Sequence, residues 1–161
     1  MTPQQPLIQK GVGAQQLLFQ SCTAFGMHLV TMPDTDLLAC TKNASLRTRL
    51  AVQQTYNLHE SLFGQVWGAF KLEDESPALA AVLSEIEALT AIIADLVIQP
   101  WLTGQKRSAA VRGFVVGLLS PLTYRALRLH GRLSPEQAID STNDALVSRL
   151  STVAAHTKGG C

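Results

Sequence analysis

The chain contains four histidines and three cysteines, the residue types that most often bind metal ions or act as bases and nucleophiles. His59 and Glu60 match the start of the H-E-x-x-H zinc motif, but Phe63 stands where the second histidine belongs. The cysteines are widely spaced and form no C-x-x-C pair, so they indicate neither a zinc site nor a disulfide framework. We therefore expect no metal and no cofactor, and we expect Cys22 and Cys40 to act as small buried hydrophobes.

The residue patterns of covalent catalysis are also missing. No serine stands in a G-x-S-x-G sequence, and neither Cys22 nor Cys40 has a neighbouring base in the sequence. The glycines form no phosphate-binding loop. The clustered acidic side chains fall in predicted breaks and helix caps, where solvation and helix dipoles explain them. The sequence therefore predicts that the chain is not an enzyme.

Aromatic side chains gather on one face of a predicted helix. Tyr56, Phe63 and Trp67 recur at steps of seven and four residues, and His59 falls on the same face. Because ligand pockets are mostly apolar with a few polar anchors, we interpret this face as a cavity wall. The expected pocket residues are His28, Tyr56, His59, Phe63, Trp67 and Phe114. The alternative is that the rings pack in the core and the histidines are ordinary hydrogen-bonded residues.

Helical periodicity runs through most of the chain, and no stretch alternates with period two, so we expect no sheet. Residues 1–13 are expected to form an irregular leader, and residues 158–161 a flexible tail. Between them, helices are expected over about 14–32, 34–41, 46–70, 76–98, 108–130 and 134–157. The sequence therefore predicts an all-α fold with a single domain of six or seven helices over residues 14–157.

Capping residues and prolines mark several of these boundaries. Asp34 is a plausible N-cap, and Ser76 caps a helix whose first position is a proline. Pro121 removes a hydrogen bond inside the helix over 108–130, so we expect a kink there. The S-x-x-Q sequence at 134–137 predicts a capping box at the start of the last helix.

The helix over 108–130 is apolar on almost every side in its first half, so it must be buried on every side. A domain of this size covers only part of such a helix, and two glycines four residues apart favour a close approach by another helix. We therefore expect a homodimer built on this helix and on the helix over 134–157. The expected interface residues are Gly113, Gly117, Leu118, Pro121, Leu122, Ile139, Leu146 and Leu150.

The composition limits the kinds of partner that we expect for the chain. Of 161 residues, 47% are apolar and only 16% are charged, which favours burial of surface in self-association. The net charge of +1 gives no global field that would attract nucleic acid or a membrane surface. No apolar run is long enough to cross a bilayer, and residues 1–13 contain no apolar signal core. We therefore expect a cytoplasmic protein.

The segment RGFVVGLLSPLTYRALRLHGRLSPEQAIDSTNDALVSRL resembles the end of the C-terminal regulatory domain of tetracycline-repressor-like (TetR) transcriptional regulators. That family commonly ends in an apolar helix, a short turn with a similar serine–proline cap, and a final amphipathic helix. The upstream stretch AFGMHLVTMPDTDLL fits the family's ligand-binding core more loosely, so the resemblance covers residues 14–157.

The resemblance implies a homodimeric regulatory domain in which the last two helices form a four-helix bundle with their mates. It also implies that a small, often apolar effector binds inside each protomer and changes the dimer geometry. Family members begin with a DNA-binding domain containing a helix-turn-helix, and this chain contains no segment like it. We therefore expect no direct contact between this chain and nucleic acid. The alternative is a helical interaction protein that dimerises with a partner regulator and has no ligand of its own.

Overall fold

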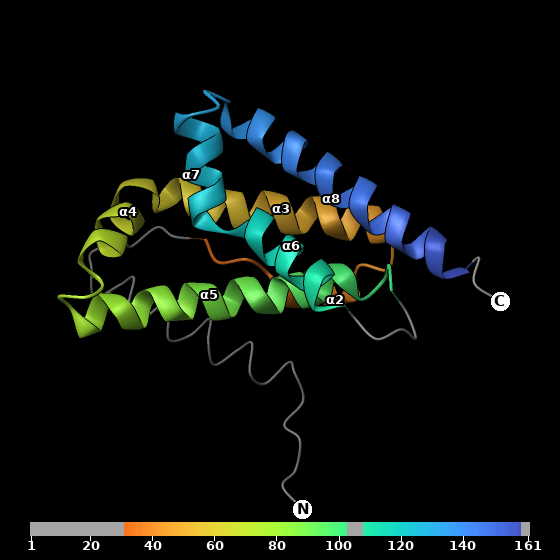
Figure 1. The fold of residues 1–161 in the computed structure, drawn as a ribbon, viewed down its shortest axis with the longest axis horizontal. Helices are drawn as coiled ribbons and strands as arrows, with labels where there is room; N and C mark the ends of the chain where they lie inside the picture. The colour runs from red at the N-terminus through yellow and green to blue at the C-terminus, as the bar shows by residue number, and fades with distance from the viewer. Residues whose placement is uncertain (1–30, 103–107, 159–161) are drawn as a thin grey trace, which may run out of the picture.

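The computed structural model describes residues 31–102 and 108–158, and these form an all-α single domain without strands (Figure 1). The predicted fold class is confirmed. The helices are α2 (Thr35–Cys40), α3 (Ala44–Ser61), α4 (Phe63–Leu72), α5 (Pro77–Ile98), α6 (Ala109–Leu119), α7 (Pro121–Leu129) and α8 (Pro135–Lys158). The predicted leader, His28 and nearly all of the helix predicted over 14–32 lie outside the described residues.

Helix α3 occupies the centre of the domain. In Figure 1 it lies between α5 and α8, and α6 and α7 cross the same side of the bundle. Its most extensive contact is with α8, and it also touches α2, α4, α5, α6 and α7. Because neighbours surround it, α3 buries residues around much of its circumference, including Val52, Tyr56 and His59. The polar groups on this helix therefore need partners inside the protein.

Local sequence signals set most helix starts as predicted. The side chain of Asp34 accepts a hydrogen bond from the backbone N–H of Leu37, and Ser76 does the same for Leu79. At the start of α8, the backbone N–H of Ser134 donates to Gln137 Oε1 at 2.9 Å. The backbone N–H of Gln137 donates back to Ser134 Oγ at 3.2 Å. This reciprocal pair is the predicted capping box.

The helix predicted over 46–70 is two helices in the structure. Helix α3 ends at Ser61, and Leu62 is the shared boundary residue of α3 and α4. The side chain of Leu62 is almost wholly buried in the core. Gly64 and Gly68 lower the helix propensity just beyond it by up to about 1 kcal/mol each, which disfavours one continuous helix through this stretch.

The helix predicted over 108–130 is also divided, and the kink expected at Pro121 is a complete break. Ser120 adopts an extended backbone conformation, with φ −66° and ψ 144°, and it ends α6 and begins α7. A residue before a proline is pushed out of the helical region, and a serine there can cap the next helix. Ser120 Oγ accepts a hydrogen bond from the backbone N–H of Leu122, with Pro121 at the first helical position.

The structure corrects one prediction of burial. Cys40, predicted to be buried, is exposed at the end of α2, because Leu38 takes the inward-facing position of this short helix. Within residues 31–102 and 108–158, no helix is long and apolar enough to cross a bilayer.

Candidate functional site

The break at Pro121 leaves backbone carbonyl groups at the end of α6 without partners from their own helix. A helix C-terminus always presents such unpaired carbonyls. Here proline also lacks the N–H that would continue the hydrogen-bond ladder to Gly117. The carbonyls of Leu118 and Leu119 have their hydrogen-bond partners on another helix.

Two side chains of α3 donate these hydrogen bonds. Tyr56 Oη donates to the carbonyl oxygen of Leu118 at 2.7 Å, and His59 Nε2 lies 2.8 Å from the carbonyl oxygen of Leu119. Thr123 Oγ1, in the first turn of α7, donates to the carbonyl oxygen of Gly117 at 2.6 Å. Tyr56 and His59 therefore cap the C-terminus of α6 from a neighbouring helix.

These bonds decide the proton positions on both side chains. A carbonyl only accepts, so His59 Nε2 carries the hydrogen, and Nδ1 is a buried acceptor without a partner among the described residues. Burial lowers the pKa of His59 to about 4. Tyr56 uses its hydrogen on Leu118, so the hydroxyl of Thr142 on α8 donates to Tyr56 Oη, at 2.9 Å. Burial also raises the pKa of Tyr56 to about 12.

A second polar cluster holds α7 against α3. Tyr124 Oη donates to Glu60 Oε2 at 2.6 Å, and Arg128 Nη2 donates to Glu60 Oε1 at 3.1 Å. Arg128 also donates through Nη1 to the carbonyl oxygen of Leu133 at 2.7 Å. Burial and the hydrogen bond to Glu60 raise the pKa of Tyr124, so its hydroxyl remains protonated and donates. This arrangement stabilises the fold and contains no nucleophile beside a free base.

The structure brings four of the predicted pocket residues together around Tyr124. The ring centroids of Tyr124 and Tyr56 are 4.6 Å apart, and Phe63 meets Tyr124 edge-on at 6.1 Å. Trp67 lies further along the same face, with the Arg125 guanidinium 3.7 Å from its ring centroid. The free space bounded by His59, Phe63, Trp67 and α7 is about 10 Å³, room for about one water molecule. In this conformation the aromatic face is packed.

Of the two other predicted pocket residues, Phe114 lies on α6 with 38% of its surface exposed and does not border this space. His28 lies outside the described residues.

The predicted interface residues divide into two groups. Gly113, Gly117 and Leu122 are exposed, and Leu118 and Pro121 are partly exposed. The α8 side chains of the set lie instead in the core of this single chain: Ile139, Leu146 and Leu150. Helix α8 uses its apolar stripe to pack on α3, so these three side chains are not available to a partner in this conformation.

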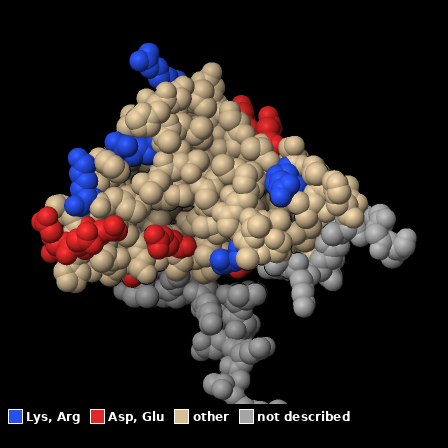
Figure 2. Space-filling view, in the orientation of Figure 1, with Lys and Arg blue, Asp and Glu red and all other residues tan. Residues whose placement is uncertain are grey.

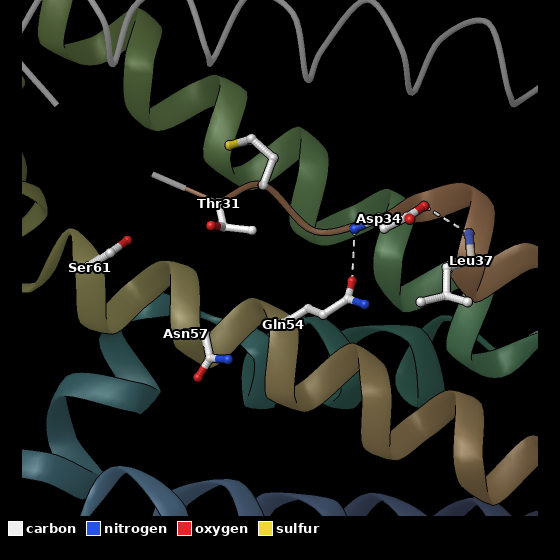
Figure 3. Close-up of a pocket in the computed structure, with 7 residues that line it drawn as sticks. Thr31, Asp34, Leu37, Gln54, Asn57 and Ser61 are labelled. Atoms are coloured by element: carbon white, nitrogen blue, oxygen red, sulfur yellow. Dashed lines mark hydrogen bonds between the residues drawn. The ribbon is translucent and has the colours of Figure 1, made fainter. Parts of the chain in front are cut away.

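The structure also contains a ligand-sized groove that the sequence analysis did not single out. It has a volume of about 390 Å³ and lies between α3 and the extended segment before α2 (Figure 3). The described residues that line it are Thr31, Met32, Asp34, Leu37, Gln54, Asn57 and Ser61. A sequence signal existed, because the last three place polar side chains at steps of three and four along one side of α3.

The described residues contain no group of histidine, cysteine and acidic side chains that could hold a metal ion. The chain matches no family model, and no curated protein or solved structure compared with it is a significant match. The fold defines the described part of the chain as an all-α domain.

Proposed function

We propose that this chain is a homodimeric, small-molecule-responsive regulatory domain similar to those of TetR-like transcriptional regulators. The observation that carries the proposal is the exposed surface of α6 and α7. We call it the α6–α7 face and define it by Gly113, Phe114, Gly117, Leu122 and Leu129. Phe114, Leu122 and Leu129 are 38%, 48% and 47% exposed. Large apolar side chains left exposed on neighbouring helices favour an interaction site there.

The charged groups of α6 and α7 have partners within the chain, which leaves this face apolar. Arg112 pairs with Asp95, Arg125 stacks on Trp67, and Arg128 pairs with Glu60. Figure 2 shows a broad uncharged area over the middle of the molecule on the side where α6 and α7 cross the bundle. Burial of this face in a second copy would remove apolar area from water without desolvating an unpaired charge.

The two glycines of this face have no role in the packing of the single chain. A Cβ atom added at Gly113 or Gly117 would meet no atom within 4 Å. A glycine inside a helix costs about 1 kcal/mol relative to alanine. Close approach by a helix of a second copy would explain why side chains are absent at these positions.

A sedimentation experiment with a matched control tests the proposal. Gly117→Glu adds a charge to the α6–α7 face, and Gly64→Glu adds the same charge to open space on α4. Glutamate favours a helix more than glycine does, so neither variant is expected to unfold the monomer. We expect a dimer for the unmodified chain and for Gly64→Glu, and a monomer for Gly117→Glu. A monomeric unmodified chain at micromolar concentration would exclude the homodimer.

The second candidate is a helical interaction protein that dimerises with a partner regulator and has no ligand. The packed aromatic face, with its free space of about 10 Å³, favours this alternative over an apolar effector bound beside His59 and Trp67. The two candidates differ in whether any small molecule stabilises the folded chain, because a ligand of the native state raises its melting temperature with concentration.

A further inference from the structure

The groove of Figure 3 has the dimensions of a small-molecule site. Its volume of about 390 Å³ falls within the roughly 300–1,000 Å³ of ligand pockets. Two apolar side chains, Met32 and Leu37, form part of its wall, and the other described side chains that line it are polar. A wholly apolar ligand would leave these polar groups without water or a partner, which is unfavourable. The groove therefore suits a polar ligand with a small apolar surface.

Hydrogen bonds already fix the orientation of two lining side chains. Gln54 Oε1 accepts a hydrogen bond from the backbone N–H of Asp34 at 2.8 Å, and this bond joins α3 to the segment before α2 (Figure 3). The amide nitrogen of Gln54 is left as a donor. Asp34 Oδ1 accepts from the backbone N–H of Leu37 at 2.8 Å, which leaves the other carboxylate oxygen as an acceptor. Neither remaining group has a hydrogen-bond partner among the described residues.

The described residues that line the groove carry a net negative charge. Among the described residues that line it, Asp34 is the single ionised one, and none is a lysine or an arginine. An anionic ligand would be repelled by this carboxylate, whereas an ammonium group would be attracted. The amide groups of Gln54 and Asn57 can donate to and accept from hydroxyl groups.

We propose that this groove is the effector site and that it binds a small polyhydroxylated amine. The ammonium group of the ligand lies at Asp34, its hydroxyl groups bond to Gln54 and Asn57, and its carbon face lies on Met32 and Leu37. This assignment rests on the proposed regulatory function and names the ligand class for it. The proposed effector site is therefore this groove and not the packed aromatic face.

Isothermal titration calorimetry with three matched sugars tests the assignment: glucosamine, glucose and glucose 6-phosphate. We expect saturable binding of glucosamine and about fivefold weaker binding of glucose, which corresponds to the upper end of what an exposed ion pair contributes. We expect no binding of glucose 6-phosphate. Equal or tighter binding of the phosphate, or no saturable binding of glucosamine, would overturn the proposal.

One substitution separates the charge of Asp34 from its structural role. Asparagine caps helices as well as aspartate does, so Asp34→Asn retains the start of α2 and removes the negative charge. We expect this variant to bind glucosamine and glucose equally, with an unchanged melting temperature without ligand. Asp36→Asn, on the same helix but outside the groove, is the control and should retain the preference. Loss of the preference in both variants would contradict a role of the groove.

The sedimentation experiment distinguishes failure of this assignment from failure of the proposed function. If the unmodified chain is a dimer and glucosamine does not bind, the groove assignment is wrong and the dimeric domain stands. If the chain is a monomer, the homodimeric function is wrong whatever the calorimetry shows.

Discussion

His59 Nε2 lies 2.8 Å from the carbonyl oxygen of Leu119, and the two residues are 60 positions apart in the chain. This hydrogen bond ties the central helix α3 to the break between α6 and α7. Pro121 causes the break, and the break creates the need for a donor. His59, which matched the start of a zinc motif in the sequence, thus has a structural role, and its second ring nitrogen is buried and unprotonated.

Acid should destabilise the fold through His59. The pKa of this residue is about 4 in the folded state and 6.5 in its ordinary state. Between pH 6.5 and 4, the unfolded chain therefore binds a proton at His59 that the folded chain does not bind. The stabilising contribution is complete above pH 6.5 and is lost as the pH falls toward 4. It amounts to roughly 3 kcal/mol.

Urea unfolding at several pH values measures this effect. The control is His59→Gln, which retains an amide donor for the carbonyl of Leu119 and does not titrate. We expect the free energy of unfolding of the variant to fall less than that of the unmodified chain between pH 6.5 and 4. Identical pH profiles would show that His59 is accessible to protons in the folded state.

Arg47 should contribute more to stability than its neighbour on the same helix, Arg49. The buried guanidinium of Arg47 donates to the carbonyl oxygens of Ala39 and Thr41 at the end of α2, and to that of Leu96 in α5. Lysine cannot span these three acceptors, so Arg47→Lys should lower the free energy of unfolding by about 2–4 kcal/mol. Arg49→Lys, at a half-exposed ion pair, should lower it by less than about 1 kcal/mol. Denaturant titrations that give equal losses would contradict this role of Arg47.

Adjacent substitutions in the turn between α7 and α8 should have opposite effects. Arg132 has φ 54°, in the left-handed region, so Arg132→Gly should relieve about 1 kcal/mol of strain. A Cβ atom at Gly131 would lie 2.7 Å from the carbonyl oxygen of Leu127, so Gly131→Ala should destabilise by at least about 1 kcal/mol. Thermal unfolding of both variants checks the prediction. Changes of the same sign would contradict the backbone geometry of this turn.

The chain alone should not bind DNA in a sequence-selective way. Its net charge is +1, and the arginines of α6 and α7 named above are engaged within the fold. A fluorescence anisotropy titration at several salt concentrations is the appropriate measurement. Selective binding that persists at 0.2 M salt would show that the sequence contains a recognition element we did not identify.

Most element types and several boundaries could be predicted from the sequence, because they depend on neighbours within one helical turn. The cap at Asp34, the cap at Ser76 and the capping box at 134–137 are contacts over three residues. The break at Pro121 is also local, and only its completeness exceeded the prediction. The end of α3 at Ser61 was not predicted, because apolar positions recur at four-residue steps through Leu62 and beyond and give no sign of a boundary.

The tertiary structure alone determined the contacts of Tyr56, of His59 and of the apolar stripe of α8. Periodicity places Tyr56 and His59 on one face of a helix, but it does not reveal whether a ligand or a helix end meets that face. The carbonyls of Leu118 and Leu119 meet it in the folded chain. Leu146 likewise belonged to a clear apolar stripe, and only packing against α3 determined that its partner lies in the same chain. The hydrophobic effect is not directional, so an apolar side chain is stabilised by burial against any apolar neighbour. The sequence therefore determines which side chains must be buried, and the fold determines which residues bury them.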